Sequence, residues 1–196
     1  MERGRVNELH YMTPIANLAS IVHYGLLSHH RAAEVPHDSI ADPSVQGNRV
    51  GKRVPNGRLL HDYVNLYFDA RNAMMYRRRN VRSTIAVLRV SSAVLDMPGV
   101  VLSDGNAASG ATQFLPCPAG LAALNQERVY TDDWDHSDPW IKQEQKRQRC
   151  AEVLVPDRVG PEHFIGCYVC TNQVVANCAT VAAELAVEVN AHVFFQ

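Results

Sequence analysis

Short apolar runs rich in β-branched and aromatic residues recur along the whole chain, and polar or proline-containing segments separate them. Runs of this length and composition favour strands, because branched side chains pack well on a pleated surface. Two other stretches, 17–27 and 171–185, place their apolar residues three and four positions apart, which is the period of a helix. The sequence therefore predicts an α+β fold of six or seven short strands with a few helices.

The remaining expectations follow from the same periodicities. Helices are expected over 17–27, where Gly25 is a C-terminal stop, over 70–78 and over 171–185, and 141–149 suits either a polar helix or an extension of the acidic loop before it. The segment from His29 to Leu60 is too long for a plain connection, so it predicts a functional loop with a helical turn near Val45–Arg49. We find no internal repeat and no linker, and residues 1–196 are predicted to form one domain. Strands are expected over 9–12, 63–68, 84–90, 100–103, 150–156, 164–170 and 187–195.

Charge and hydropathy exclude several classes of protein. With 19 Lys and Arg against 20 Asp and Glu, the net charge is -1, so an anionic partner has to be held by a local basic patch. A hydrophobic fraction of 46% excludes intrinsic disorder. No apolar run approaches the roughly 20 residues that span a bilayer, and no signal-peptide block follows the N-terminus. We therefore expect a cytoplasmic protein with no membrane partner.

Motifs for metal and nucleotide binding are missing. The chain has five cysteines, an odd number. Cys167 and Cys170 fall in a strand-like run, where residues three apart face opposite sides, so they cannot easily share a metal ion or a disulfide. The nine histidines show no His-Glu-x-x-His spacing, so no metal is expected. The glycine patterns of P-loops, Rossmann folds and serine-hydrolase elbows are also missing.

Glu152 is the carboxylate that fits its surroundings least. In an alternating strand it shares a face with Cys150 and Leu154, which are both apolar. A carboxylate on an apolar face is costly unless it is hydrogen-bonded or used chemically. An outward position at a sheet edge and a functional role both remain open at this point.

Two basic segments could hold an anion. Residues 45–55 combine Arg49, Lys52 and Arg53 with glycines, and a guanidinium can form a bidentate pair with phosphate or carboxylate. Residues 77–82 contain four arginines directly after Tyr76, an arrangement that suits single-stranded nucleic acid. A solvated basic loop remains the alternative for both segments.

Many of these residues recur together in a known order. The Leu-His-Asp-Tyr-Val block at 60–64 and the Ala-Glu-Val-Leu strand at 151–154 are the most specific of them. Together with the other matching stretches they resemble the DarT family, toxins that ADP-ribosylate single-stranded DNA with NAD. Residues 105–118 and 131–149 match least. The matching stretches are 9–13, 17–21, 25–27, 39–43 with Arg49, 60–68, 71–76, 150–155 and 194–195.

The resemblance implies an ADP-ribosyltransferase-like split mixed β-core with flanking helices and NAD in its cleft. It implies catalytic roles for Arg49 and Glu152. The residues expected to contact NAD are His10, Tyr11, Met12, Asn17, Arg49 and Tyr67. The residues expected to contact DNA are Arg77, Arg78, Arg79, Arg82, Lys146, Arg147 and Arg149.

The implied acceptor is a ring nitrogen of thymidine, and the implied partner is a DarG-type macrodomain antitoxin that removes the modification. Two alternatives remain. One is an ADP-ribosyltransferase that acts on another nucleobase, on RNA or on protein, because the poorly matching loop 131–149 would set the acceptor. The other is a binding module without activity, whose signature would be the loss of Glu152 or Arg49; both residues are present.

Overall fold

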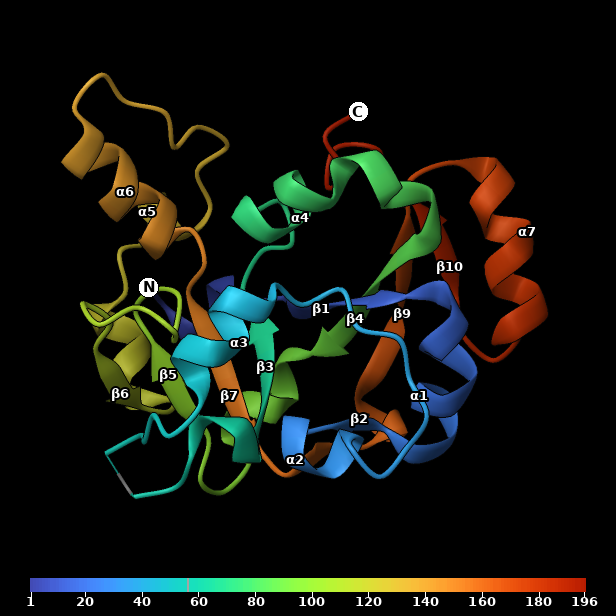
Figure 1. The fold of residues 1–196 in the computed structure, drawn as a ribbon, viewed down its shortest axis with the longest axis horizontal. Coiled ribbons are helices and arrows are strands. Elements are labelled where there is room, and N and C mark those ends of the chain that lie inside the picture. The colour runs from blue at the N-terminus through green and yellow to red at the C-terminus, as the bar shows by residue number, and fades with distance from the viewer. Residues whose placement is uncertain (56) are drawn as a thin grey trace.

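A mixed sheet of eight strands forms the centre of the fold in the computed structural model, which describes residues 1–55 and 57–196. Its strand order is β10-β9-β4-β1-β3-β7-β5-β6, and every neighbouring pair is antiparallel except β9 and β10. Figure 1 shows β5 and β6 at one end of the molecule and α7 with β10 at the other. The strands of this sheet are β1 (Glu8–Pro14), β3 (Tyr63–Tyr67), β4 (Ile85–Ser91), β5 (Val101–Ser103), β6 (Phe114–Pro116), β7 (Glu152–Pro156), β9 (Phe164–Val169) and β10 (Val187–Val189).

Helices and a small second sheet surround this core. In Figure 1, α3 lies in front of the central strands, and α4 lies above them. The second sheet pairs β2 (Leu26–Leu27) with β8 (Arg158–Val159). The helices are α1 (Leu18–Tyr24), α2 (His29–Ala32), α3 (Pro43–Arg49), α4 (Ala73–Arg78), α5 (Gln126–Val129), α6 (Pro139–Gln148) and α7 (Asn172–Val181). None of the helices in the described residues is long and apolar enough to cross a membrane.

The predicted α+β class with a mixed sheet is confirmed. The helical turn expected near Val45–Arg49 is the last part of α3, and 141–149 is helical rather than an extended loop because Asp138 caps α6 and Pro139 begins it. Asp138 accepts hydrogen bonds from the backbone N–H groups of Trp140 and Ile141.

The last expected strand is wrong beyond Val189. The chain turns at Asn190, whose side chain accepts a hydrogen bond from the backbone N–H of Val193, and the amide of Phe194 bonds to Ala191. Phe194 is fully buried, so the apolar pattern at the C-terminus reflects a turn packed into the core and not a strand. The helix expected within 17–27 is α1, which ends at Tyr24, and the predicted stop at Gly25 is confirmed because this glycine adopts a φ of 83°.

Two hydrophobic clusters lie on opposite faces of β7. Val153 and Val155 belong to the main core, whereas Leu154 packs with Val54, Leu60, Tyr63 and Ala107 in a second cluster. This alternation is the one expected for a strand with a period of two. It places the side chain of Glu152 on the same face as Leu154, toward α3 and the segment between β5 and β6.

Candidate active site

Glu152 begins β7 and lies in the middle of the sheet. Its Cα is paired with Tyr67 of β3 on one side and Ser103 of β5 on the other. Its backbone N–H donates to the hydroxyl of Ser103 at 3.2 Å. The side chain is 0% exposed, so Glu152 is not at a sheet edge. A buried carboxylate requires a partner, and the structure provides one.

Arg49 is that partner. One guanidinium nitrogen, Nη2, donates to both carboxylate oxygens of Glu152, at 2.6 and 2.8 Å, and the backbone N–H of Ala107 donates to Oε1 at 2.9 Å. Residues 103 positions apart therefore meet in one buried cluster. Helix α3 delivers Arg49 from its last turn, and Asp42 caps its first turn by accepting from the N–H of Ser44.

Little water reaches the Arg49–Glu152 ion pair, so the attraction between the two charges is weakly screened. The Arg49 side chain is 6% exposed. Burial lowers the pKa of Arg49, but the charge and hydrogen bonds of Glu152 raise it, and the net pKa lies above the usual arginine value. Arg49 therefore stays a guanidinium at every working pH.

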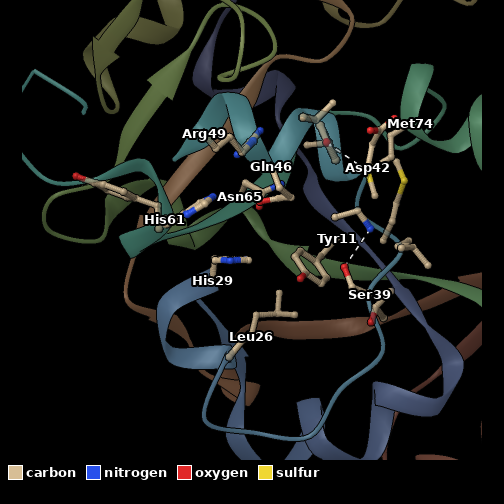
Figure 2. A pocket seen from close by; sticks show the side chains of 18 of the residues that line it. Tyr11, Leu26, His29, Ser39, Asp42, Gln46, Arg49, His61, Asn65 and Met74 are labelled. Carbon is tan, nitrogen blue, oxygen red and sulfur yellow. Dashed lines mark hydrogen bonds between the residues drawn. The ribbon is translucent and has the colours of Figure 1, made fainter. Parts of the chain in front are cut away.

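A pocket of about 440 Å³ lies in front of this pair. Arg49 lines the pocket, whereas Glu152 lies behind it and does not. Figure 2 shows Arg49 and Gln46 from α3, His29 from α2 and Tyr11 from β1 around the same space. The pocket therefore presents the guanidinium of Arg49, and the carboxylate of Glu152 lies behind it.

Five of the six residues predicted to contact NAD line this pocket, namely Tyr11, Met12, Asn17, Arg49 and Tyr67. His10 does not. Its Nε2 lies 3.0 Å from a carboxylate oxygen of Glu8, and its ring stacks on Tyr168 at a centroid distance of 6.2 Å. Tyr11 and Met12 therefore line the pocket, whereas the His10 ring lies against Glu8 and Tyr168.

The pocket rim carries part of the predicted DNA-binding set. Arg77 and Arg78 of α4 and Lys146 and Arg147 of α6 line it. Arg77, which is 61% exposed, pairs with Asp42 at 2.7 Å, and Arg78 Nε donates to the carbonyl of Ile40 at 2.8 Å. Both arginines therefore also hold the segment that leads into α3.

The other predicted DNA-binding residues lie elsewhere. Arg79 and Arg82 belong to the 3-10 helix after α4, where Arg79 stacks on the ring of Tyr76 at 4.2 Å. Arg149 faces the interior, because its side chain is 0% exposed and pairs with Asp69 at 3.0 Å.

Comparison with known proteins identifies the family. Residues 10–195 match the sequence model described as "ssDNA thymidine ADP-ribosyltransferase, DarT". The chain belongs to the DarT family. Among curated relatives, it is 31% identical over 182 residues to a DNA ADP-ribosyl transferase-DNA ADP-ribosyl glycohydrolase fusion protein of Thermosipho africanus (strain H17ap60334). It is 29% identical over 158 residues to the DNA ADP-ribosyl transferase of Thermus sp. (strain 2.9).

Solved structures of DarT proteins share this fold. The Thermosipho africanus DarTG structure in complex with ADP-ribose has a TM-score of 0.83 and 26% identity, covering 96% of this chain and 51% of that chain. The Thermus sp. 2.9 DarT structure in complex with ADP-ribosylated ssDNA has a TM-score of 0.84 and 24% identity, covering 96% of both chains. The alignments with the curated relatives cover 88% and 75% of this chain. The chain spans 45% of the Thermosipho fusion protein and 73% of the Thermus protein.

Sequence reasoning assigned no role to two histidines that line the pocket of this DarT-family chain. His29 and His61 line the pocket with their rings tilted by 32° at a centroid distance of 4.2 Å, and His61 Nε2 lies 3.1 Å from the amide oxygen of Gln46. Burial and the nearby His29 lower the pKa of His61 to about 4, so it is neutral at pH 7. The density of histidines between residues 29 and 61 was the available signal. No group of His, Cys, Asp or Glu in the described residues is arranged to hold a metal ion.

Proposed function

We propose that this chain transfers ADP-ribose from NAD to a thymidine base in single-stranded DNA. The observation that carries the proposal is the buried Arg49–Glu152 pair, in which Arg49 lines the pocket and Glu152 lies directly behind it. The family match supports the choice of reaction, and the Thermus sp. 2.9 DarT structures were solved in complex with NAD+ and with ADP-ribosylated ssDNA.

The pocket suits NAD as a substrate. Its volume of about 440 Å³ lies within the usual range of roughly 300–1,000 Å³ for small-molecule and cofactor sites. Aromatic side chains from Tyr11 and Tyr67 offer stacking surfaces, and Tyr67 is the residue that we assign to the nicotinamide ring. Arg49 offers the positive charge that a pyrophosphate requires.

Glu152 supplies the negative charge for bond cleavage. NAD contributes the ADP-ribosyl group: its ribose–nicotinamide bond breaks, nicotinamide leaves with the bonding electrons, and positive charge develops on the ribose until the thymine ring nitrogen forms a new bond to the same ribose carbon. A preorganised carboxylate beside that charge stabilises it, and the same carboxylate accepts the proton lost by the thymine ring nitrogen. The N–H of Ala107 holds this carboxylate in place during both steps.

Arg49 controls access to Glu152. Phosphate and the thymine carbonyl are both acceptors for its guanidinium, so substrates replace the carboxylate as its partners when they enter the pocket. Polarisation of the thymine carbonyl makes the neighbouring N–H more acidic. Arg49→Lys keeps the charge but loses the planar fork, and we expect it to lose most activity.

The DNA strand enters between α4 and α6. The two helices place Arg77 and Lys146 at the pocket rim, and Arg79 and Arg82 extend the basic surface past α4. A local path of this kind fits a chain whose net charge is -1. Arg149 is omitted from this path because it is buried.

The biological role follows the same proposal. We propose a cytoplasmic toxin whose partner is a DarG-type macrodomain antitoxin. The Thermosipho relative, named as a transferase fused to a DNA ADP-ribosyl glycohydrolase, supports the pairing of the two activities.

The test is mass spectrometry of oligonucleotides that carry one thymidine each, after incubation with the protein and NAD. We expect one added ADP-ribose on single-stranded DNA and none on thymidine-free DNA, RNA or protein. Glu152→Gln should abolish the product, with a loss of at least about 10²-fold, while NAD binding measured by calorimetry persists. Glu162→Gln, at a side chain that is 71% exposed, is the control and should keep full activity. Modification of RNA or protein but not DNA would overturn the proposed acceptor.

A further inference from the structure

The segment between β5 and β6 (residues 104–113, the β5–β6 segment) connects the pocket to the catalytic carboxylate. Asn106 and Ser109 line the pocket, and the N–H of Ala107 donates to Glu152. Glycine and alanine occupy five of its ten positions. Hydrogen bonds within the segment shape its turns, among them Thr112 Oγ1 to the carbonyl of Asn106 at 2.7 Å and the N–H of Gln113 to Asp104 at 2.8 Å, and contacts from outside anchor it to the rest of the fold.

Arg147 fixes the segment at both ends. Its Nη1 donates to Asp104 at 2.7 Å and to the hydroxyl of Thr112 at 3.1 Å, and its Nη2 donates to Asp104 at 3.2 Å. Its backbone carbonyl accepts from the N–H of Asn106 at 3.0 Å. The first, third and ninth residues of the segment are therefore bound to one arginine of α6.

All five N–H groups of Arg147 are used within the chain. The remaining two bonds go to Glu144, from Nε at 2.8 Å and from Nη2 at 2.7 Å. A guanidinium has five donors, so none is left for a phosphate. Hydrogen bonds to Glu144 together with Asp104 raise the pKa of Arg147, and its side chain is 10% exposed.

One further contact joins the segment to Arg147, and a second contact, from Lys52, anchors it independently of Arg147. A Cβ at Gly105 would lie 2.9 Å from the carbonyl oxygen of Arg147 and closer still to its guanidinium, so only glycine fits there. At the far side, Lys52 Nζ donates to the carbonyl of Ser109 at 2.6 Å.

We propose that Arg147 is a positioning residue, which holds the β5–β6 segment so that the N–H of Ala107 orients the Glu152 carboxylate and Asn106 shapes the pocket wall. Arg147 acts on catalysis through the segment and makes no contact with the DNA backbone. The inference rests on the proposed transferase function for its kinetic consequences, whereas the structural link from Arg147 to Ala107 is measurable without any substrate.

The first test compares Arg147→Lys with the wild type in steady-state transfer to a thymidine oligonucleotide. Lysine keeps the charge but has three donors on one nitrogen, so it cannot reproduce the five hydrogen bonds that the three nitrogens of Arg147 make to Asp104, Thr112 and Glu144. We expect kcat to fall about 10- to 100-fold, because small displacements of catalytic groups have effects of this size. The KM for NAD should stay within about threefold, and the salt dependence of the KM for DNA should not change.

If Arg147 instead contacts a DNA phosphate, the kinetic effects should be the opposite of these. Lysine would then preserve most of the activity, and Arg147→Gln would raise the KM for DNA and lower its salt slope by about one. That result would overturn the positioning role. Arg3→Lys is the matched control, because Arg3 also pairs with an aspartate, Asp96 at 3.1 Å, and has no part in the site. This variant should keep wild-type kinetics.

The second test is hydrogen exchange on the protein alone. In Arg147→Lys and in Gly105→Ala, we expect the amides of 104–113 to exchange at least about tenfold faster, while β4 and β9 keep their protection. Unchanged exchange in both variants would overturn the link to Ala107. Faster exchange with unchanged kcat would overturn its catalytic importance. Absence of transfer by the wild-type protein would refute the proposed function and leave the exchange result standing.

Discussion

Removal of one member of the Arg49–Glu152 pair should destabilise the fold far more than removal of both. Glu152→Gln leaves a guanidinium that is 6% exposed without a counter-charge, and Arg49→Met leaves a fully buried carboxylate with one N–H donor, that of Ala107. Loss of one partner from a buried pair costs about 3–5 kcal/mol, because the remaining charge is desolvated and unpaired. The double variant contains no buried charge at this place, so it should cost less than either single change.

Urea unfolding of the four proteins at pH 7 measures this coupling. We expect the midpoints of both single variants to fall clearly below that of the double variant, with little change in the slope m. The coupling free energy between the two positions should exceed about 2 kcal/mol. A parallel cycle on the exposed Arg3–Asp96 pair, whose side chains are 37% and 62% exposed, is the control and should give less than about 1 kcal/mol.

Additive effects would refute the reasoning. If the double variant loses the sum of the two single losses to within about 0.5 kcal/mol, the two side chains do not interact in solution. The pocket would then lack the arrangement on which the proposed chemistry depends.

Three further predictions concern groups around the site. Burial raises the pKa of Glu8, but hydrogen bonds from His10 and Arg89 lower it to about 2, so its contribution to stability is present above pH 4.5 and is lost as the pH falls to about 2. The difference in stability between wild type and Glu8→Gln, measured by urea unfolding, should therefore shrink over that pH range. A constant difference would contradict this role. The pKa of His61 is about 4, so the stability of the wild type should fall from pH 6.5 to pH 4 as the unfolded chain takes up the proton. His61→Gln should flatten this part of the plot of stability against pH. Equal slopes in the two proteins would refute this effect of His61. Asn72 caps α4 by accepting from the N–H groups of Met74 and Met75, so Asn72→Ala should cost about 1–2 kcal/mol in urea unfolding, and a loss below about 0.3 kcal/mol would show that the cap is dispensable.

Short apolar runs rich in β-branched and aromatic residues predicted much of the sheet. They placed β1, β3, β4, β7 and β9 close to their observed bounds, because strands that are buried on both faces, as β4 and β7 are, read as nearly continuous apolar runs. The same signal failed at the C-terminus, where Phe194 is buried from a turn. Burial, which the pattern reports, does not by itself distinguish a strand from a packed turn.

Charge was less informative than hydropathy about the site. The basic residues of 77–82 and 146–149 look alike in the sequence, but Arg77 is exposed at the pocket rim and Arg149 is enclosed in the core. Arg149 can be buried because it pairs with Asp69, a carboxylate from another part of the chain. Such pairings depend on distance in space, which a single sequence does not report.

The sequence by itself determined the fold class, the anomalous position of Glu152 on an apolar strand face and, through the order of its motifs, the resemblance to DarT. Only the tertiary structure decided that Arg49 covers Glu152, that Tyr11 and not His10 faces the pocket, and that Arg147 holds the β5–β6 segment. The physical reason is that periodicity and composition are local properties of the chain. Ion pairs and pocket walls form between segments that meet only after the sheet has assembled.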